Sequence, residues 1–87
     1  MIHLTYHAVE RAMQRFSWDK DKLYEKALSS LSEGIFVLHD EVLREIFLVN
    51  CQYKGGLPYA YEGVVFVFDE DRLITVYPIT GHGTVRS

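Results

Sequence analysis

The chain has few of the residues that mark disulfide-stabilised or membrane-spanning proteins. Its 87 residues include one cysteine, Cys51, which excludes an intramolecular disulfide and a zinc site built on two cysteines. No apolar run approaches the roughly 20 residues that a membrane helix needs. The first residues show neither the basic nor the apolar part of a signal peptide. The sequence therefore predicts a cytoplasmic protein that does not contact the membrane.

The chain also lacks an excess of basic charge. Its net charge at pH 7 is −3, so it would attract a polyanion only weakly over long distances. The charge is unevenly distributed, because residues 1–26 contain five basic and four acidic side chains, whereas the rest contains four basic and eight acidic ones. A cationic surface, if there is one, is expected to be local and N-terminal.

What is present is the composition of one folded domain. Hydrophobic residues make up 48% of the chain and aromatic residues 14%, without repeats or low-complexity segments. A chain of this length can build one hydrophobic core and no second one. We expect a single domain over residues 1–87, with a loosely held tail over about residues 80–87.

The N-terminal third has the pattern of two helices. Thr5 is a suitable N-cap for a helix over about residues 6–16, and Ser17 or Asp19 is expected to cap a second helix that runs to about Ser32. Gly34 is expected to end that helix in a left-handed conformation. The predicted buried residues of the two helices are Tyr6, Val9, Ala12, Met13 and Phe16, and then Leu23, Tyr24, Ala27, Leu28 and Leu31.

After the second helix the pattern becomes strand-like. Short runs of β-branched and aromatic residues alternate with polar turns, which predicts antiparallel strands. The expected fold class is α+β, with two N-terminal helices packed on one face of a C-terminal antiparallel sheet of about four strands. The predicted strands cover residues 35–38, 44–49, 63–68 and 73–77, with an opening strand at 2–4, polar turns at 39–41 and 69–71, and a loop at 53–58.

One side of the first predicted helix carries residues suited to phosphate chemistry. His7, Arg11 and Arg15 follow one another at steps of four and therefore share a side with Glu10 and Gln14. Imidazole titrates near neutral pH, and guanidinium presents a planar set of donors that fits a phosphate. The plainer interpretation of this side is a solvated polar surface with local partners.

The last predicted strand carries a second group of polar side chains. Thr75 and Tyr77 alternate with apolar residues and share one strand face; if Val76 faces the helices, both point the opposite way. Tyr61 is expected to extend this patch, and with Tyr59 it offers rings on which RNA bases stack. Tyrosines also suit a protein-binding surface, and threonine and tyrosine are common strand residues for packing reasons alone.

The sequence predicts no metal site and no cofactor. His3 precedes the helix that holds His7, and no carboxylate stands at a matching spacing. His39 lies in a predicted turn and His82 in the tail. Gly55-Gly56 lacks the Lys-Ser/Thr pair and the helix of a phosphate-binding loop.

Two stretches resemble a known family. His7-Ala8-Val9-Glu10-Arg11 with Arg15, and the late Leu73-Ile74-Thr75-Val76-Tyr77-Pro78, resemble the barnase/colicin/RelE superfamily of small metal-independent ribonucleases. The toxin domains of contact-dependent growth inhibition are the most similar members, and the resemblance covers about residues 3–79. It implies an endoribonuclease that acts on RNA, often tRNA, and an antitoxin or immunity protein as partner.

The resemblance also implies a mechanism and roles. The ribose 2′-hydroxyl would attack the adjacent phosphate and leave a cyclic phosphate, which requires a base, an acid and donors to the phosphate oxygens but no metal. His7 would be the general base or acid, Arg11 and Arg15 would hold the phosphate, and Thr75 and Tyr77 would donate hydrogen bonds to it.

Two other functions stay open from the sequence. A non-catalytic interaction module of the same fold would bind protein through its tyrosine-rich surface, and an inactive relative would bind RNA without cleaving it. The discriminating feature is convergence, because catalysis requires His7, Arg11 and Thr75 to reach one phosphate position. A binding module has no such requirement.

Overall fold

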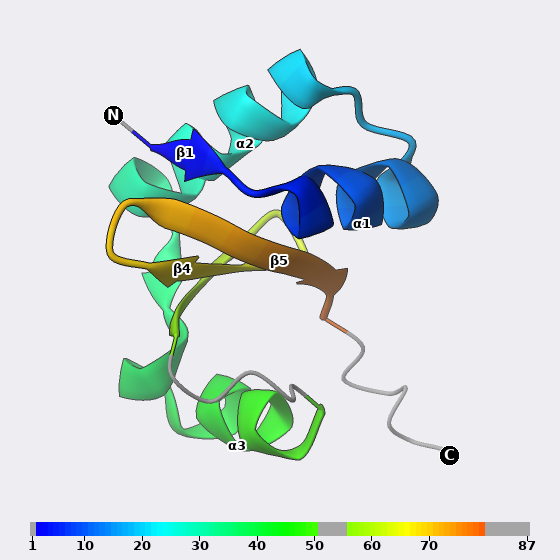
Figure 1. Ribbon diagram of the computed structural model, residues 1–87. Helices are drawn as coiled ribbons and strands as arrows, with labels where there is room; N and C mark the ends of the chain where they lie inside the picture. The colour runs from blue at the N-terminus through cyan, green and yellow to red at the C-terminus, as the bar shows by residue number, and fades with distance from the viewer. Residues whose placement is uncertain (1, 51–55, 80–87) are drawn as a thin grey trace.

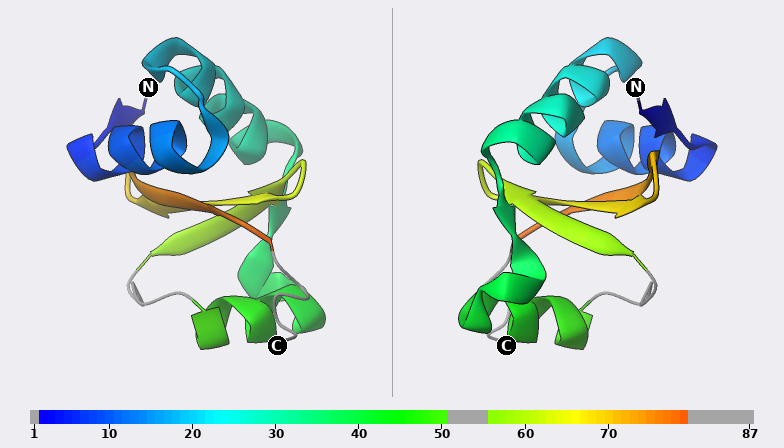
Figure 2. Two further views of the ribbon diagram at one scale, coloured as in Figure 1. Left: turned by 90° about the vertical axis from the view of Figure 1, so that its right-hand side faces the viewer. Right: turned by 90° about the vertical axis from the view of Figure 1, so that its left-hand side faces the viewer.

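The computed structural model describes residues 2–50 and 56–79, which form three layers (Figures 1 and 2). Helices α1 and α2 cover one face of a sheet, and a short 3-10 helix, η1, lies with α3 on the other side. The predicted α+β class is confirmed. The elements are β1 His3–Leu4, α1 Tyr6–Phe16, α2 Lys20–Glu33, β2 Ile35–Phe36, η1 Val37–His39, α3 Glu41–Asn50, β3 Leu57–Tyr61, β4 Val64–Asp69 and β5 Arg72–Pro78.

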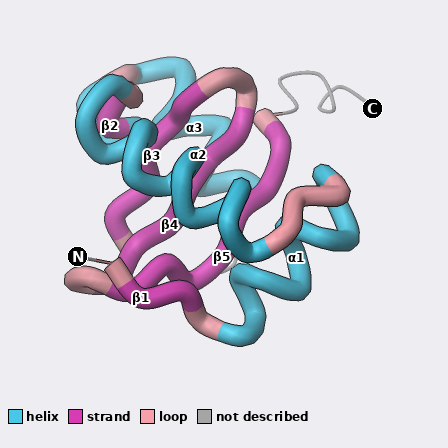
Figure 3. Tube along the Cα trace, turned by 90° about the horizontal axis from the view of Figure 1, so that it is seen from above, coloured by secondary structure: helices cyan, strands magenta, loops and turns pink. Residues whose placement is uncertain are grey.

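The described part of the chain forms one sheet in the order β1-β5-β4-β3-β2. Strands β2 to β5 pair antiparallel with one another, as the class of sheet predicted, whereas the opening strand β1 pairs in parallel with β5. Strand β3 itself was not predicted. The first and last strands thus lie side by side, and seen from above β1 leads directly into α1 (Figure 3).

The predicted helices are confirmed together with most of their ends. The Thr5 hydroxyl accepts a hydrogen bond from the Ala8 amide at 3.2 Å, and Asp19 caps α2 by accepting one from the Lys22 amide at 2.8 Å. Ser17 does not cap α2. It ends α1 in the left-handed conformation, with φ 58°, and its amide donates to the Met13 carbonyl.

Gly34 ends α2 for a different reason from the one predicted. Its φ is −80°, so the left-handed stop is wrong. A Cβ at this position would lie 2.7 Å from the Ala60 carbonyl oxygen and closer still to that of Ser30. Glycine is required here because α2 passes directly against β3.

The buried side of α2 is also rotated relative to the prediction. Leu23 and Ala27 are fully buried, but Leu28 and Leu31 are 42% and 40% exposed. Ser30 is buried in their place, and its hydroxyl donates to the Ala27 carbonyl at 2.7 Å. A small side chain with a satisfied hydroxyl allows the close approach to β3 that a leucine would prevent.

The predicted strand over residues 44–49 is wrong, because this segment belongs to helix α3. Asp40 is the missed signal: its carboxylate accepts a hydrogen bond from the Leu43 amide at 3.0 Å and so caps the helix. The predicted strand over 35–38 is shorter than expected, because Val37 and Leu38 enter η1. A short apolar run is compatible with either structure when only its period is read.

The predicted loop over 53–58 overlaps β3, which begins at Leu57 and places Pro58 opposite Val67. Residues 53–55 of that loop, Cys51, and the predicted tail with His82 lie outside the described residues. Glu62 and Gly63, both with positive φ, connect β3 to β4 in the two-residue turn typical of hairpins.

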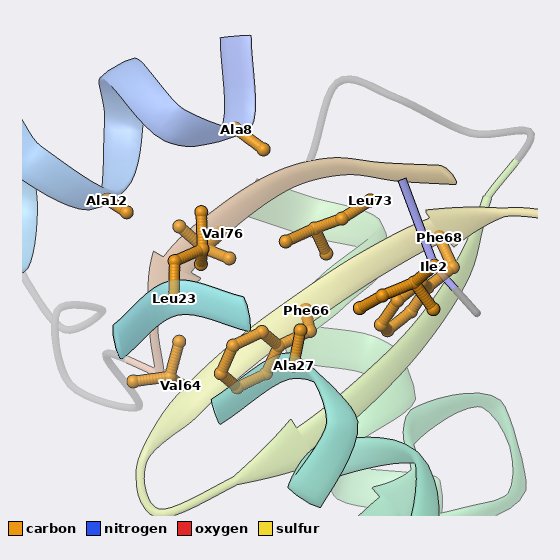
Figure 4. Close-up of a cluster of buried hydrophobic side chains, with 10 residues drawn as sticks. All are labelled: Ile2, Ala8, Ala12, Leu23, Ala27, Val64, Phe66, Phe68, Leu73 and Val76. Atoms are coloured by element: carbon orange, nitrogen blue, oxygen red, sulfur yellow. The ribbon is translucent and has the colours of Figure 1, made fainter. Parts of the chain in front are cut away.

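The main core lies between the sheet and helices α1 and α2 (Figure 4). The Trp18 ring stacks on Phe16 at 4.6 Å and on Phe66 at 6.2 Å between ring centroids, which ties the α1–α2 connection to the central strand. We call this face of the sheet the helix face. Its buried cluster comprises Ile2, Ala8, Ala12, Leu23, Ala27, Val64, Phe66, Phe68, Leu73 and Val76.

The opposite face of the sheet, here called the second face, carries a smaller cluster of Val37, Ala60, Val65 and Val67. Tyr77 packs against it from β5 and Leu43 from α3. Strand β4 is therefore buried on both sides along residues 64–68, which explains its uninterrupted apolar run.

Candidate binding face of helix α1

Helix α1 is held against β5 by small side chains. Ala8 and Ala12, one turn apart, are fully buried, so the helix backbone lies close to the strand. The Thr5 hydroxyl donates to the Leu73 carbonyl at 2.7 Å and fixes the start of the helix on β5. These contacts decide which side of α1 faces solvent.

The predicted apolar side of α1 is only partly correct. Ala12 is buried, and Val9 and Phe16 pack at the margin of the main core. Tyr6 and Met13 are instead 82% and 52% exposed. The small side chains of the two alanines let the helix backbone pack closest to the sheet, so this side of α1 faces the sheet. The helix is rotated accordingly, and Tyr6 and Met13 point outward.

The two arginines of α1 bond to different elements, one to β5 and one to α1 itself. Arg15 donates through Nη1 to the Val76 carbonyl at 3.0 Å, and Arg11 donates through Nη1 to the Gln14 side-chain oxygen at 2.9 Å. His7 is exposed on the same side, as predicted. Among the described residues, neither arginine lies within 4.0 Å of a carboxylate.

Thr75 and Tyr77 lie on the second face, away from α1. Thr75 is paired with Val67 and Tyr77 with Val65, both of which belong to the second-face cluster. Val76 between them is fully buried in the main core.

An irregularity in β5 produces this arrangement. The register shifts between Val67 and Phe68, so that Thr75 opposes Val67 but Leu73 opposes Phe68, leaving Ile74 as an extra residue. Leu73 and Val76, three positions apart, therefore both face the helices. Without this bulge, Leu73 and Thr75 would share a face.

Tyr59 and Tyr61 lie on the helix face and do not extend a patch with Thr75 and Tyr77. The Tyr59 ring contacts Phe36 at 5.2 Å and Phe68 at 5.9 Å between centroids. Tyr61 is half-buried against the main core. The predicted site thus divides into a group on α1, a group on the second face and two tyrosines packed in the helix layer.

We define the outer face of α1 as its exposed arc, which comprises Tyr6, His7, Glu10, Met13, Gln14 and Arg15 together with the half-buried Arg11. Tyr6 and Met13 lie on one flank of this arc and Arg11 and Arg15 on the other, with Glu10 between them. The sequence analysis missed Tyr6 and Met13 as functional candidates because it assigned them to the core. The signal that could have found them is the Ala8–Ala12 pair, since two alanines at a spacing of four mark a close helix contact.

No group of three or more His, Cys, Asp or Glu side chains that could hold a metal ion occurs within residues 2–50 and 56–79. Over the same ranges, no helix has the length and apolar character needed to cross a membrane. No family model, curated protein or solved structure matches this chain.

Proposed function

We propose that this protein is a protein-interaction module and that the outer face of α1 is its binding surface. One observation carries the proposal: Tyr6 is 82% exposed and Met13 52% exposed on a helix that also presents Arg11 and Arg15. Tyrosine, methionine and arginine are enriched in protein interfaces, and tyrosine and arginine dominate their binding energy.

The charge of this face indicates the chemistry of the partner. Arg11 and Arg15 are oriented by uncharged acceptors, the Gln14 amide oxygen and the Val76 carbonyl, so neither positive charge is neutralised locally. Carboxylates form the strongest hydrogen bonds with such guanidinium groups. The expected partner is a protein surface that embraces the helix, with an apolar part against Tyr6 and Met13 on one flank and acidic side chains against Arg11 and Arg15 on the other.

The division of the predicted catalytic group supports binding over catalysis. Thr75 and Tyr77 lie on the second face, whereas His7 and Arg11 lie on α1. A catalytic site needs these groups within a few ångströms of one phosphate, and a binding surface does not. The net charge of −3 also disfavours a polyanionic partner.

Site-specific photocrosslinking in cells tests the proposal. A benzophenone amino acid is placed at position 6, and a matched control carries it at position 70, in the exposed β4–β5 turn. We expect one discrete crosslinked protein from position 6 that position 70 does not give. The additional substitution Arg11→Glu should reduce that product, because it opposes the partner's acidic side chains. Identical products from positions 6 and 70 would contradict the proposal.

A metal-independent ribonuclease is the second candidate, because His7 is exposed on the same side of α1 as the two arginines without carboxylate partners. Incubation of the protein with total tRNA in EDTA tests it, with His7→Ala as the variant and Glu33→Ala as the exposed control. Fragments ending in cyclic phosphate that only His7→Ala abolishes would establish the nuclease, and intact tRNA would exclude it.

A further inference from the structure

The backbone of β1 presents an open side. The His3 amide donates to the Asp71 carbonyl at 2.7 Å and the Thr5 amide to the Leu73 carbonyl at 3.2 Å, so residues 3 and 5 face β5. Successive residues of a strand direct their amide and carbonyl groups to opposite sides. The N–H and C=O of Leu4 therefore point away from β5. Because β1 ends the described sheet, no strand there pairs with them.

An open pocket of about 680 Å³ lies beside this strand, between β1 and the first turns of α2. Ile2, only 8% exposed, and the half-buried Leu4 and Tyr24 supply its apolar surface. Exposed charged side chains lie at its rim. The complete lining is Ile2, His3, Leu4, Lys20, Asp21 and Tyr24.

We propose that an extended peptide segment of a partner protein binds here as an added strand beside β1. Its backbone would pair with the outward N–H and C=O of Leu4, and one apolar side chain would enter the pocket against Ile2 and Tyr24. A groove between a strand edge and a helix is a recurrent geometry for peptide binding, in which the backbone bonds contribute affinity and the pocket selects alternate side chains.

Two features favour a peptide over a compact small molecule. The Leu4 donor and acceptor lie on one side of a strand, in the arrangement that a second extended backbone matches. The rim carries Lys20 and Asp21 as neighbours of opposite charge, so neither an anionic nor a cationic ligand is preferred. Recognition would then rest on the backbone and on an aliphatic or aromatic anchor residue. This site is separate from the outer face of α1 and does not depend on the function proposed for it.

The probe is a displayed library of random 12-residue peptides, selected on the immobilised 87-residue chain and followed by synthesis of the best sequence. We expect selected peptides to share an apolar residue flanked by variable positions. In the complex, hydrogen exchange of the Leu4 amide should slow at least tenfold, whereas the already bonded His3 and Thr5 amides should change little.

A chemically synthesised chain with N-methyl-Leu4 separates backbone pairing from pocket filling. The methyl group removes the outward donor and keeps both bonds to β5, so we expect at least a tenfold loss of peptide affinity with an unchanged circular dichroism spectrum. N-methyl-Tyr6 is the control, since the first amide of a helix has no partner within the helix. Tyr24→Ala should also weaken the peptide at least tenfold.

Three results would overturn the proposal. These are that no selected peptide binds in solution, that the bound peptide leaves the Leu4 amide exchanging freely, or that N-methyl-Leu4 binds the peptide as well as the unmodified chain does. The last result would show that the peptide binds without pairing with the backbone of β1. The exchange measurement uses the unmodified chain, so the proposal stays testable if N-methyl-Leu4 fails to fold.

Discussion

The two faces of the sheet differ in how they are covered and in what they leave exposed. The helix face buries a large cluster drawn from Ile2, the helices α1 and α2, and the strands β4 and β5, including the aromatic rings of Phe66 and Phe68. The second face buries a smaller cluster of three valines and one alanine. Because hydrophobic stabilisation grows with the apolar area removed from water, most of the folding free energy is expected on the helix face.

The two sides of α1 differ in a similar way, because one side packs on the sheet and the other is exposed to solvent. Ala8 and Ala12 contribute little apolar area but bring the helix close to β5, whereas Tyr6 and Met13 on the other side remain in contact with solvent. The residues that hold the helix in place are thus distinct from those that we expect to bind. Substitutions on the outer face should change binding while leaving the fold intact.

The largest expected effect on the free energy of unfolding comes from comparing Phe66 and Val67, adjacent residues of β4 whose side chains point to opposite faces of the sheet. Phe66→Ala should lower the free energy of unfolding by about 3–5 kcal/mol, because it empties the centre of the main core. Val67→Ala should cost about 2 kcal/mol, corresponding to two buried carbon groups in the smaller cluster. Urea denaturation followed by circular dichroism measures both. Equal losses would show that the second face stabilises the fold as strongly as the helix face.

Two glycines allow two backbone constraints to be compared, a close contact at Gly34 and a positive φ at Gly63. Gly34→Ala should cost at least about 1–3 kcal/mol, because the added methyl group would collide with the backbone carbonyls of Ser30 and Ala60. Gly63→Ala meets no atom within 4 Å but must adopt φ +79°, which costs about 1–2 kcal/mol. Thermal unfolding of both variants gives the order. A larger loss for Gly63→Ala would contradict the close contact between α2 and β3.

The two sides of α1 give a third contrast. Ala12→Leu should cost about 1–3 kcal/mol, because the larger side chain forces the helix away from β5. Met13→Ser and His7→Ala, on the outer face, should change the free energy of unfolding by less than about 0.5 kcal/mol. If His7→Ala unfolds the protein instead, His7 has a structural role and is unavailable for binding or catalysis.

The smallest expected effect concerns the ion pair between α2 and the β3–β4 turn. The Lys26 ammonium lies 2.6 Å from the Glu62 carboxylate; this hydrogen bond lowers the pKa of Glu62 below 4.5 and raises the pKa of Lys26 above 10.5. The pair therefore stabilises the fold between these two values. Its contribution is lost as the pH falls through the lowered pKa of Glu62 or rises through the raised pKa of Lys26.

Glu62→Gln tests this pair, and Glu33→Gln is the control. We expect a small decrease in the melting temperature at pH 7, because exposed ion pairs stabilise little, and no difference from the unchanged chain at strongly acidic pH. A difference that persists where Glu62 is protonated would show that the carboxylate charge is not responsible.

Much of the helical layer was predictable because its signals are local. Thr5 and Asp19 cap their helices with side chains that act within three residues, and the β4–β5 hairpin follows from two apolar runs around an acidic turn. The segment after His39 was mispredicted as a strand because its apolar run hid the helix cap at Asp40. The predicted ends of helices and strands were thus correct wherever a polar capping or turn residue marked the end and was recognised.

The candidate site was harder to predict because it depends on rotation and register. The sequence placed His7, Arg11 and Arg15 on one side of α1, but the choice of the side that enters the core was made by the close contact of two alanines with β5. The face occupied by Thr75 was decided by one extra residue, Ile74, in the pairing of β4 with β5. A single-residue shift moves every following side chain to the other face.

By itself, the sequence determined the α+β class, the two N-terminal helices, the final hairpin and the common side of the α1 cations, since each of these follows from periodicity and capping within a few residues. Only the tertiary structure decided that Tyr6 and Met13 face solvent, that Thr75 and Tyr77 lie across the sheet from α1, and that β1 joins β5 with its outer side open. The physical reason is that helix rotation, strand register and edge pairing are set by contacts between residues far apart in the chain, such as Thr5 with Leu73 and Arg15 with Val76.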